Sequence, residues 1–394
     1  MKTKQLNILF VLENYYPHIG GVENLFKNLC EGLVKRGHCI TVITRLLPKT
    51  KREEKIGGVH IVRVPCFDNR YLFTFAALPK VWRYTKNADI ISTTTFNAAP
   101  PAWLAGKLRN KPVLITVHET WIGKWRQYTN FSWPKMMLHE VLERIVFLPT
   151  YDSYVCDSDA TTIQLKDVLP KQKDRIKRIH AGFDPSHWKK RFDTAALRKK
   201  LGLQNKFIVL GYGRPGTSKG FPYLIDAFPE IKKRVPNAVL LMILSKDKQY
   251  AQEIEEFKKR ADSDVKFLDP QPYDKLPRFI QMANCVVVPS ITEGFGYTTL
   301  ESCAAGTPVV ASNTTSIPEV ISGKHVLVEP KSSRAIAKGV EKVYKKECGV
   351  TPEKQFPWSR TVSLYEKEYN TLLQSFAKTM TKIRSIQRKI KRGA

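Results

Sequence analysis

Short runs of apolar, mostly β-branched residues alternate along the first half of the chain with stretches whose apolar positions recur at helical spacing. The apolar runs predict strands at residues 6–12, 39–44, 89–92, 112–117 and 153–158. After the first run, apolar positions from Val22 to Leu33 predict a helix that ends at Gly37. Strands rich in Val and Ile that alternate with helices are typical of a parallel sheet with helices on both faces.

The same pattern begins again after residue 200. It predicts strands at residues 206–213, 238–244, 264–268, 284–290 and 308–312, with a helix from Leu224 to Val235 after the first of them. The polar, charged and proline-containing segment 183–193 is the expected linker. We therefore expect an α/β fold of two Rossmann-like, doubly wound parallel-sheet domains, residues 1–184 and 185–360, that face each other across a cleft. Ligands of such sheets bind beyond the carboxyl ends of the strands.

The composition adds a strongly basic surface to this picture. The chain of 394 residues has 65 Lys and Arg against 36 Asp and Glu, and its net charge of +29 favours nucleic acids, anionic lipids or phosphorylated substrates as partners. Its seven cysteines are scattered without a C-x-x-C motif, which is typical of reduced thiols in a cytoplasmic protein. No apolar run reaches the roughly 18 residues of a membrane-spanning helix. Glu13 and Asn14 follow the first run, which favours a first strand over a secretory signal peptide.

Two glycine-rich turns lie where a strand should lead into a helix. Gly20 and Gly21 follow the first strand, and backbone N–H groups there could bind an anion at the helix N-terminus. A tight turn without any ligand explains this glycine pair equally well.

The second turn, from Gly213 to Gly220, carries cations. Arg214 can bind two oxygens of a diphosphate, Lys219 adds a point charge, and the following helix N-terminus adds partial positive charge. Two solvated cations beside a turn are the simpler alternative. The stretch also contains a literal G-x-G-x-x-G, Gly211 to Gly216, but the next strand ends in Ser245 rather than in the acid that an NAD site needs.

The most specific motif is the sequence E-G-F-G-Y-T-T-L-E at residues 293–301, between a predicted strand and a predicted helix. Glu293 is expected in the loop, and Glu301 on the helix can accept hydrogen bonds from both hydroxyls of a ribose. Backbone N–H groups between them form a second anion site at a helix start. Two solvated acids are a weaker interpretation, because apolar Leu300 and Cys303 flank Glu301. The expected ligand contacts are Glu293, Gly294, Phe295, Gly296, Tyr297, Thr298 and Glu301.

A single histidine, His118, ends the apolar run at 112–117. A histidine after a strand is more often a satisfied structural residue than a catalytic one. Its expected place at the carboxyl end of a strand favours a catalytic role together with Glu293, Arg214 and Lys219.

Together these motifs resemble those of the family-4 retaining glycosyltransferases, a GT-B family, over nearly the whole chain. Residues 293–312, EGFGYTTLESCAAGTPVVAS, are similar to the signature E-G-F-G-x-x-x-x-E-A-x-A-x-G-x-P-V-V-A-S. Residues 211–220, GYGRPGTSKG, are similar to a G-R-x-x-x-x-K-G loop, and residues 17–23, PHIGGVE, to an N-terminal Gly-Gly loop. The resemblance implies a retaining, metal-independent hexosyltransferase that uses a UDP- or GDP-sugar donor and no cofactor.

The resemblance also implies roles for single residues. It implies that Arg214 and Lys219 contact the donor diphosphate, that Gly21 lies near it, and that Glu301 contacts the ribose. In the front-face mechanism that this family favours, the leaving phosphate oxygen takes the proton of the acceptor hydroxyl.

The donor sugar is assigned by the same resemblance to two residues. Glu293 is implied on the sugar hydroxyls, where it would position the sugar rather than attack it, and His118 is implied near the sugar 6-position.

Two positions depart from the family pattern. His180-Ala181-Gly182 stands where P-N-G is frequent, and residues 313–316, Asn-Thr-Thr-Ser, stand where a glycine pair is frequent. The second change lies close to the expected donor pocket, so the identity of the sugar cannot be inferred from any relative. Residues 356–373 are similar to the closing segment of the family, which implies that the last helix, about 361–394, crosses back onto the first domain.

The acceptor is indicated only by surface composition. Aromatic residues mix with cations at residues 70–75 and 121–133, and the end of the chain is basic without any acid: Lys378, Lys382, Arg384, Arg388, Lys389, Lys391 and Arg392. These features favour a lipid-linked or membrane-surface glycan acceptor and an anionic membrane as a candidate partner, with the protein at the cytoplasmic membrane face. Ordinary loop packing and a solvated tail explain them equally well.

Three other functions compete with this one. The net charge would suit a nucleic-acid-binding protein, but no RNA- or DNA-binding module is recognisable, so we expect no nucleic-acid partner. A GT-B relative could instead epimerise or hydrolyse its nucleotide sugar. An inactive scaffold is disfavoured, because all four charged donor residues are present.

Overall fold

The chain folds into two compact units. The computed structural model describes residues 4–18, 20–67, 69–246 and 250–392, with side chains up to residue 382. Unit 1 comprises Met1–Ile122, Met137–Gly182 and Phe356–Ala394, and unit 2 comprises Gly123–Met136 and Phe183–Gln355. Each unit is a mainly parallel sheet between helices, so the predicted two-domain Rossmann-like α/β fold is confirmed. Residues 123–136, which the sequence assigned to the first domain, group with unit 2 instead.

The sheet of unit 1 has the strand order β3-β4-β2-β1-β5-β6-β7-β8. Its strands are β1 (Asn7–Val11), β2 (Cys39–Arg45), β3 (Glu53–Ile56), β4 (Val59–Val64), β5 (Ile90–Thr94), β6 (Val113–Val117), β7 (Ser153–Cys156) and β8 (Ile176–Arg178). All neighbours pair in parallel except the β3–β4 hairpin at one edge. The five strands expected from the apolar runs are confirmed. The pattern missed β3 and β8 because an exposed, charged edge strand and a three-residue strand have no apolar run.

Strand β4 was also missed, because its sequence contains a charged residue that turns out to be buried. The guanidinium of Arg63 is enclosed, and both of its terminal nitrogens have partners: it donates to the carbonyl oxygens of Lys51 (3.0 Å) and Tyr16 (2.9 Å) and pairs with the carboxylate of Glu54. A buried cation is tolerable only with such partners. Arg63 therefore ties the hairpin to the segment that follows β1.

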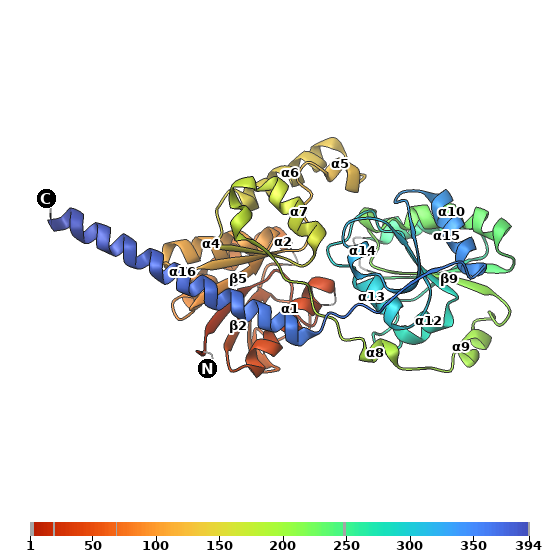
Figure 1. Cartoon of the computed structure of the whole chain (residues 1–394), viewed down its shortest axis with the longest axis horizontal. Coiled ribbons are helices and arrows are strands. Elements are labelled where there is room, and N and C mark those ends of the chain that lie inside the picture. Colours follow the sequence, from red (N-terminus) through yellow and green to blue (C-terminus); the bar gives the residue numbers. More distant parts are fainter. Residues whose placement is uncertain (1–3, 19, 68, 247–249, 393–394) are drawn as a thin grey trace. The chain divides into compact units, whose positions relative to one another are not determined.

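Helices cover both faces of this sheet. One face carries α1 (Gly21–Lys35) and the first half of α16 (Trp358–Arg392), which lie side by side (Figure 1). The other face carries α2 (Arg70–Ala76), α3 (Leu78–Thr85), α4 (Ala99–Leu108), α6 (Trp133–Phe147) and α7 (Asp159–Val168). The short elements η1 (Phe96–Ala98) and η2 (Pro170–Arg175) complete this unit. No helix among the described residues is long and apolar enough to cross a membrane.

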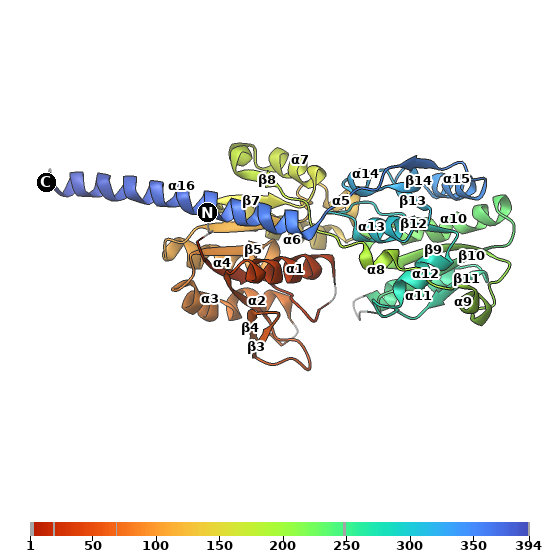
Figure 2. The same cartoon turned by 60° about the horizontal axis from the view of Figure 1, so that its bottom comes forward.

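Helix α16 is anchored by buried aromatic and charged groups. The side chains of Tyr365 and Tyr369 are fully buried in the core that α1 shares with the sheet. Glu366 accepts a hydrogen bond from Nε2 of His38 (3.0 Å), because Nδ1 of that ring already accepts from the backbone N–H of Leu6 (3.1 Å). The far end of the helix extends past the other elements of unit 1 (Figure 2). The side chains of the tail cations from Arg384 onward lie outside the described residues.

The sheet of unit 2 has the strand order β11-β10-β9-β12-β13-β14-β15. Its strands are β9 (Phe207–Gly213), β10 (Ala238–Leu244), β11 (Val265–Leu268), β12 (Cys285–Val288), β13 (Val309–Ser312), β14 (Gly323–Val328) and β15 (Gly349–Thr351). The first five were expected and are confirmed. The sequence missed β14 and β15, which pair antiparallel to each other at the edge.

Helices also pack on this second sheet. They are α8 (Ser186–Lys189), α9 (Ala195–Lys200), α10 (Phe221–Arg234), α11 (Ala251–Arg260), α12 (Leu276–Met282), α13 (Tyr297–Ala304), α14 (Ile317–Val320) and α15 (Ser333–Tyr344), with η3 (Thr217–Lys219) and α5 (Trp125–Tyr128) as shorter pieces. The expected linker 183–193 is not a solvated connection along its whole length. Trp188 within it is fully buried, and the neighbouring His187 stacks on Tyr273 at 4.7 Å between ring centroids.

Candidate functional site

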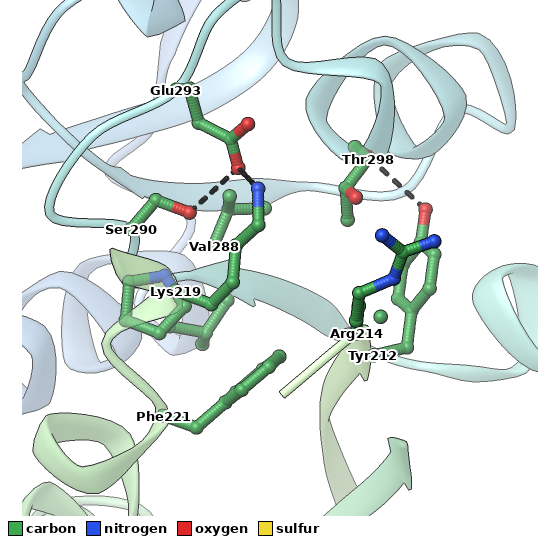
Figure 3. A pocket seen from close by; sticks show the side chains of 11 residues that line it. Tyr212, Arg214, Lys219, Phe221, Val288, Ser290, Glu293 and Thr298 are labelled. Atoms are coloured by element: carbon green, nitrogen blue, oxygen red, sulfur yellow. Dashed lines mark hydrogen bonds and ion pairs between the residues drawn. The ribbon is translucent and has the colours of Figure 1, made fainter. Parts of the chain in front are cut away.

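A pocket of about 280 Å³ opens at the carboxyl ends of β9 and β12 in unit 2 (Figure 3). Its lining residues are Tyr212, Gly213, Arg214, Lys219, Phe221, Val287, Val288, Pro289, Ser290, Glu293 and Thr298. Four of these were expected from the sequence as ligand contacts: Arg214, Lys219, Glu293 and Thr298. The lining of the pocket combines apolar walls with a few polar groups, as small-molecule sites do.

The cationic side of the pocket is built by the turn between β9 and α10. Arg214 directly follows β9, and Lys219 ends the short helix η3. Gly220 then has φ of 67°, and a Cβ there would lie 2.0 Å from the carbonyl oxygen of Pro289. Only glycine fits at this point, and its presence lets the turn carrying both cations lie directly against the loop after β12.

The acidic side is formed by Glu293. Its Oε1 lies 2.8 Å from Nζ of Lys219 and accepts a hydrogen bond from Ser290 Oγ at 2.9 Å (Figure 3). The backbone N–H of Glu293 donates to Thr315 Oγ1 (2.9 Å), and Ser316 Oγ donates to the carbonyl of Glu293 (2.9 Å). The segment that departs from the family pattern thus supplies two hydroxyls that hold this acid in place.

The loop after Glu293 leads into α13. Gly294 and Phe295 precede Gly296, which caps the helix with φ of 94°, and Tyr297 is the first helical residue. The ring of Phe295 is buried and contacts that of Tyr297 at 5.3 Å between centroids. The backbone N–H groups of a first helical turn are those that an anion can bind.

Glu301, one turn further along α13, lies behind the pocket wall. The hydroxyl of Tyr212 is 3.0 Å from Glu301 Oε2 and 3.1 Å from the carbonyl of Thr298. Desolvation raises the pKa of Glu301 to about 8, and the hydrogen bond from Tyr212 lowers it only in part. This carboxyl therefore exchanges its proton near neutral pH.

The expected residues of the first half lie in unit 1. Gly20 is the N-cap of α1 and Gly21 its first residue, while Ile19 lies outside the described residues. The buried carboxylate of Glu23 sits in the first turn of α1, 3.0 Å from Nδ1 of His18. The backbone at Gly20 is extended, so nothing in its conformation requires a glycine.

His118, at the end of β6, is paired with a residue that the sequence did not single out. Nδ1 of His118 lies 2.8 Å from Oδ2 of Asp157, which follows β7 and is buried. Because a carboxylate accepts the Nδ1 proton, Nε2 of the neutral ring is left with a lone pair. That Nε2 atom is buried and has no hydrogen-bond partner within the described part of the chain.

Sequence reasoning missed three residues that contact the expected ones: Asp157, Tyr212 and Ser290. It did single out the segment 313–316, but not the bonds of Thr315 and Ser316 to Glu293. His118 was singled out because it lies at the carboxyl end of a strand. The same argument applies to Asp157, since the two residues follow adjacent parallel strands. Nothing in the sequence pairs Tyr212 with Glu301, because the two are 89 positions apart.

Comparison with known proteins gives two family matches. Residues 19–187 match the family Glycosyltransferase Family 4, and residues 193–356 match Glycosyl transferases group 1. An uncharacterized glycosyltransferase of Methanocaldococcus jannaschii is 29% identical over 365 residues, which cover 86% of this chain and 89% of that protein. Alpha-monoglucosyldiacylglycerol synthase of Streptococcus pneumoniae is 25% identical over 329 residues, 79% of this chain and 72% of that one.

Among solved structures, Anabaena HepE in complex with UDP-glucose superimposes with a TM-score of 0.68 at 20% identity, covering 96% of this chain and all of HepE. This likeness concerns the fold. The family matches on successive halves of the sequence, and the two Rossmann-like units that they coincide with, make this chain a glycosyltransferase of family 4, of the GT-B kind.

Proposed function

We propose that this glycosyltransferase takes a sugar from a UDP- or GDP-sugar and transfers it, with retention of configuration and without a metal ion, to a lipid-linked or membrane-surface acceptor. One observation carries the proposal: Arg214, Lys219 and Glu293 line a single pocket at the carboxyl ends of two strands. Two cations beside a carboxylate suit a diphosphate joined to a sugar, since the cations bind phosphate oxygens and the carboxylate binds hydroxyls.

The donor half of the proposal rests on this pocket and on the relatives. The guanidinium of Arg214 can bind two phosphate oxygens, and the ammonium group of Lys219, which contacts the Glu293 carboxylate, adds a second positive charge. Glu301 would accept hydrogen bonds from the ribose hydroxyls, and the first turn of α13 would add N–H groups for phosphate. HepE, which has the same fold, binds UDP-glucose.

The chemical step needs chiefly a stabilised leaving group. As the bond to the diphosphate breaks, negative charge grows on its oxygens, and Arg214 and Lys219 lower the energy of that state. Glu293 is held by Lys219 and Ser290, so its role is to position the sugar rather than to attack it. A leaving phosphate oxygen would take the proton of the acceptor hydroxyl on the same face. Nε2 of His118 would accept a hydrogen bond from the sugar 6-hydroxyl.

Independence from metal is supported by how the acids are paired. The sequence contains two D-x-D triplets, at 157–159 and 262–264, a spacing that could suit a divalent cation. Each carboxylate is already paired: Asp157 with His118 (2.8 Å), Asp159 with Arg178 (3.0 Å), Asp262 with Lys232 (3.2 Å) and Asp264 with Lys232 (2.6 Å). None of the four lines the pocket of unit 2.

A lipid acceptor is supported by one relative and by the surface of unit 1. The Streptococcus pneumoniae relative is named for a glycolipid product, alpha-monoglucosyldiacylglycerol. In this chain, Tyr71, Leu72 and Phe75 of α2 are exposed directly beside Arg70, a mixture that suits a lipid headgroup region.

Thermal unfolding with a panel of nucleotide sugars, including UDP-glucose and GDP-mannose, tests the donor. At about 100 times its dissociation constant, a donor stabilises the protein by about 2.7 kcal/mol, a readily measured rise in Tm. Arg214→Ala and Lys219→Ala should each abolish the rise, whereas Lys258→Ala, an exposed cation of the same unit, should leave it intact.

Product analysis then separates transfer from the alternatives. With the stabilising donor and a diacylglycerol or glycolipid acceptor, sugar should appear on the lipid with the anomeric configuration of the donor, in buffer containing EDTA. Release of free sugar alone, or an epimerised donor, would show a different reaction. A panel in which no nucleotide sugar raises Tm would contradict the proposal at its first step.

A further inference from the structure

The outward face of helix α6 is largely apolar. Six large apolar side chains are exposed there or just beyond the helix end, and we call this set the α6 apolar face: Trp133, Met137, Leu138, Val141, Ile145 and Leu148. Trp133 is 70% exposed and Leu148 is 78% exposed. At about 100° per residue, all of them except Leu138 fall within an arc of about 120°, which Arg144 and Pro134 share. Surface helices normally show polar residues to solvent, so this face has the opposite pattern.

The orientation of α6 is fixed by its inward side. Val146 and Phe147 are buried in the core beneath the sheet of unit 1. Glu143 is buried as well, and its Oε1 accepts a hydrogen bond from the backbone N–H of Trp121 at 2.8 Å. A rotation that buried Val141 and Ile145 would expose these groups and break that bond. The apolar face is therefore a consequence of how the helix packs.

One of the two segments that the sequence offered as lipid-facing, residues 121–133, is only partly exposed. Trp125 in that segment is buried and Trp121 is half-buried, which leaves Trp133 as its exposed tryptophan. The exposed apolar surface continues instead along α6. By contrast, no large apolar side chain is exposed on α1 or on the described part of α16, which cover the opposite face of the sheet.

The part of the sequence that contains α6 is basic. From residue 70 to residue 148 it has eleven Lys and Arg but four Asp and Glu. Lys135 on α6 is exposed, and so is Arg126 shortly before it; Arg144 is exposed as well but pairs with Glu140 on the same helix (2.8 Å). An exposed tryptophan at one end, a row of aliphatic side chains and flanking cations are the composition of a surface that inserts among anionic headgroups.

We propose that the α6 apolar face lies in the headgroup region of an anionic bilayer and docks unit 1 on the membrane. With 15 residues and three charged positions in its last two turns, the helix rests on the bilayer rather than crossing it. Docking is inferred from this surface alone. Its purpose would be to bring unit 1 to a lipid acceptor, and that part rests on the proposed function. Unit 1 would thereby present the carboxyl ends of its strands near the membrane without any spanning segment.

Vesicle flotation of the full-length protein tests the proposal. The wild type should float with vesicles of phosphatidylglycerol and phosphatidylcholine, and bind pure phosphatidylcholine vesicles at least about tenfold less. The double variant Val141→Glu, Ile145→Glu should lose at least about tenfold in binding to the anionic vesicles, because both carboxylates would enter the apolar layer. Val350→Glu, at an exposed apolar position in unit 2, should float like the wild type.

Three outcomes would overturn the proposal. The wild type could stay unbound with anionic vesicles at low salt. The double variant could bind like the wild type, while replacement of the cations from Lys382 to Arg392 by glutamine removed binding, which would assign docking to the tail alone. The wild type could form a dimer without lipid that the double variant abolishes, which would make α6 an interface between copies.

Two further measurements keep this test separate from the proposed function. Melting of the double variant should match that of the wild type, because both positions are exposed. Its stabilisation by a nucleotide sugar should also be unchanged, since the pocket lies in unit 2. Loss of flotation with an intact donor response supports docking, and loss of the donor response in the wild type would concern the proposed function alone.

Discussion

The carboxyl group of Glu301 lies behind the pocket of unit 2, where it is hydrogen-bonded to Tyr212. Burial raises its pKa from 4.5 to about 8, so near neutral pH a large part of the protein carries this group protonated. A protonated carboxyl has fewer acceptor positions for two ribose hydroxyls than a carboxylate has. An acid with a raised pKa also retains its proton in the folded state, so its contribution to the free energy of unfolding decreases as pH rises from about 4.5 to about 8.

From these two facts we predict that donor affinity increases with pH while stability without donor decreases. Between about pH 7 and about pH 9, the dissociation constant of the nucleotide sugar should fall by up to about tenfold, since one pKa unit corresponds to about 1.4 kcal/mol. Calorimetric titration over this range measures the change. Glu301→Gln should bind more weakly and lose the pH dependence; a dependence that persists in this variant would assign it to another group.

The pair of His118 and Asp157 leads to a second prediction at this scale. In Asp157→Asn, the amide can donate to Nδ1, which moves the ring proton to Nε2 and removes the lone pair proposed to face the sugar. We expect kcat to fall by about tenfold to a hundredfold, while donor binding measured by thermal shift stays within about twofold.

The control and the spectroscopic test distinguish this role from simple structural support. Asp167→Asn, an exposed acid on α7, should keep the wild-type kcat. Nitrogen chemical shifts of the His118 ring should report the proton on Nδ1 in the wild type and on Nε2 in the variant. A variant with unchanged shifts and a lower kcat would show that Asp157 acts in some other way.

At the scale of elements, α16 stabilises unit 1 although it comes last in the sequence. Tyr369 is fully buried between α1 and the sheet, and its hydroxyl lies 3.1 Å from Ser92 Oγ. Tyr369→Ala should lower the free energy of unfolding by about 3–5 kcal/mol through the cavity that it leaves. Chemical denaturation measures the loss, and Tyr344→Ala, an exposed tyrosine on α15, should lose much less. If both variants lost the same free energy of unfolding, α16 would not unfold together with unit 1.

Elements also differ in how well the pattern of the sequence predicted them. Strands β1, β2, β5, β6 and β7 are nearly continuous apolar runs because helices cover them on both sides. Edge strand β3 alternates exposed and half-buried residues, three of its four being charged, and β4 contains Arg63, whose charge is neutralised by partners that no local pattern reveals. The segment around Trp188 looked like a linker because its neighbours are charged, yet the indole itself is buried.

For the whole molecule, the net charge of +29 sets the response to salt. A nucleotide sugar carries two negative charges, so the field of a basic protein increases its local concentration near the pocket. We predict that raising ionic strength from about 0.05 M to about 0.5 M weakens donor binding by about threefold to tenfold, because screening shortens the reach of these charges. Titrations at several salt concentrations test this. An affinity independent of salt would mean that only the cations in contact with the donor contribute.

The sequence alone determined those features of the protein that depend on residues close together along the chain. The alternation of apolar runs with amphipathic stretches determined two parallel-sheet units, and the contiguous motifs at 213–220 and 293–301 determined which loops carry cations and carboxylates. These signals are local, because strand and helix periodicity repeats within a few residues.

Only the tertiary structure decided which distant groups meet and which faces remain in water. Asp157 reaches His118 because β6 and β7 are neighbours, and Tyr212 reaches Glu301 because strand β9 ends where helix α13 begins, at the same edge of a sheet. Residues of α6 that could fill a core when read in sequence are exposed, because a few buried contacts fix the rotation of the helix. Pairing and rotation depend on packing between elements, which the local periodicity of a sequence does not encode.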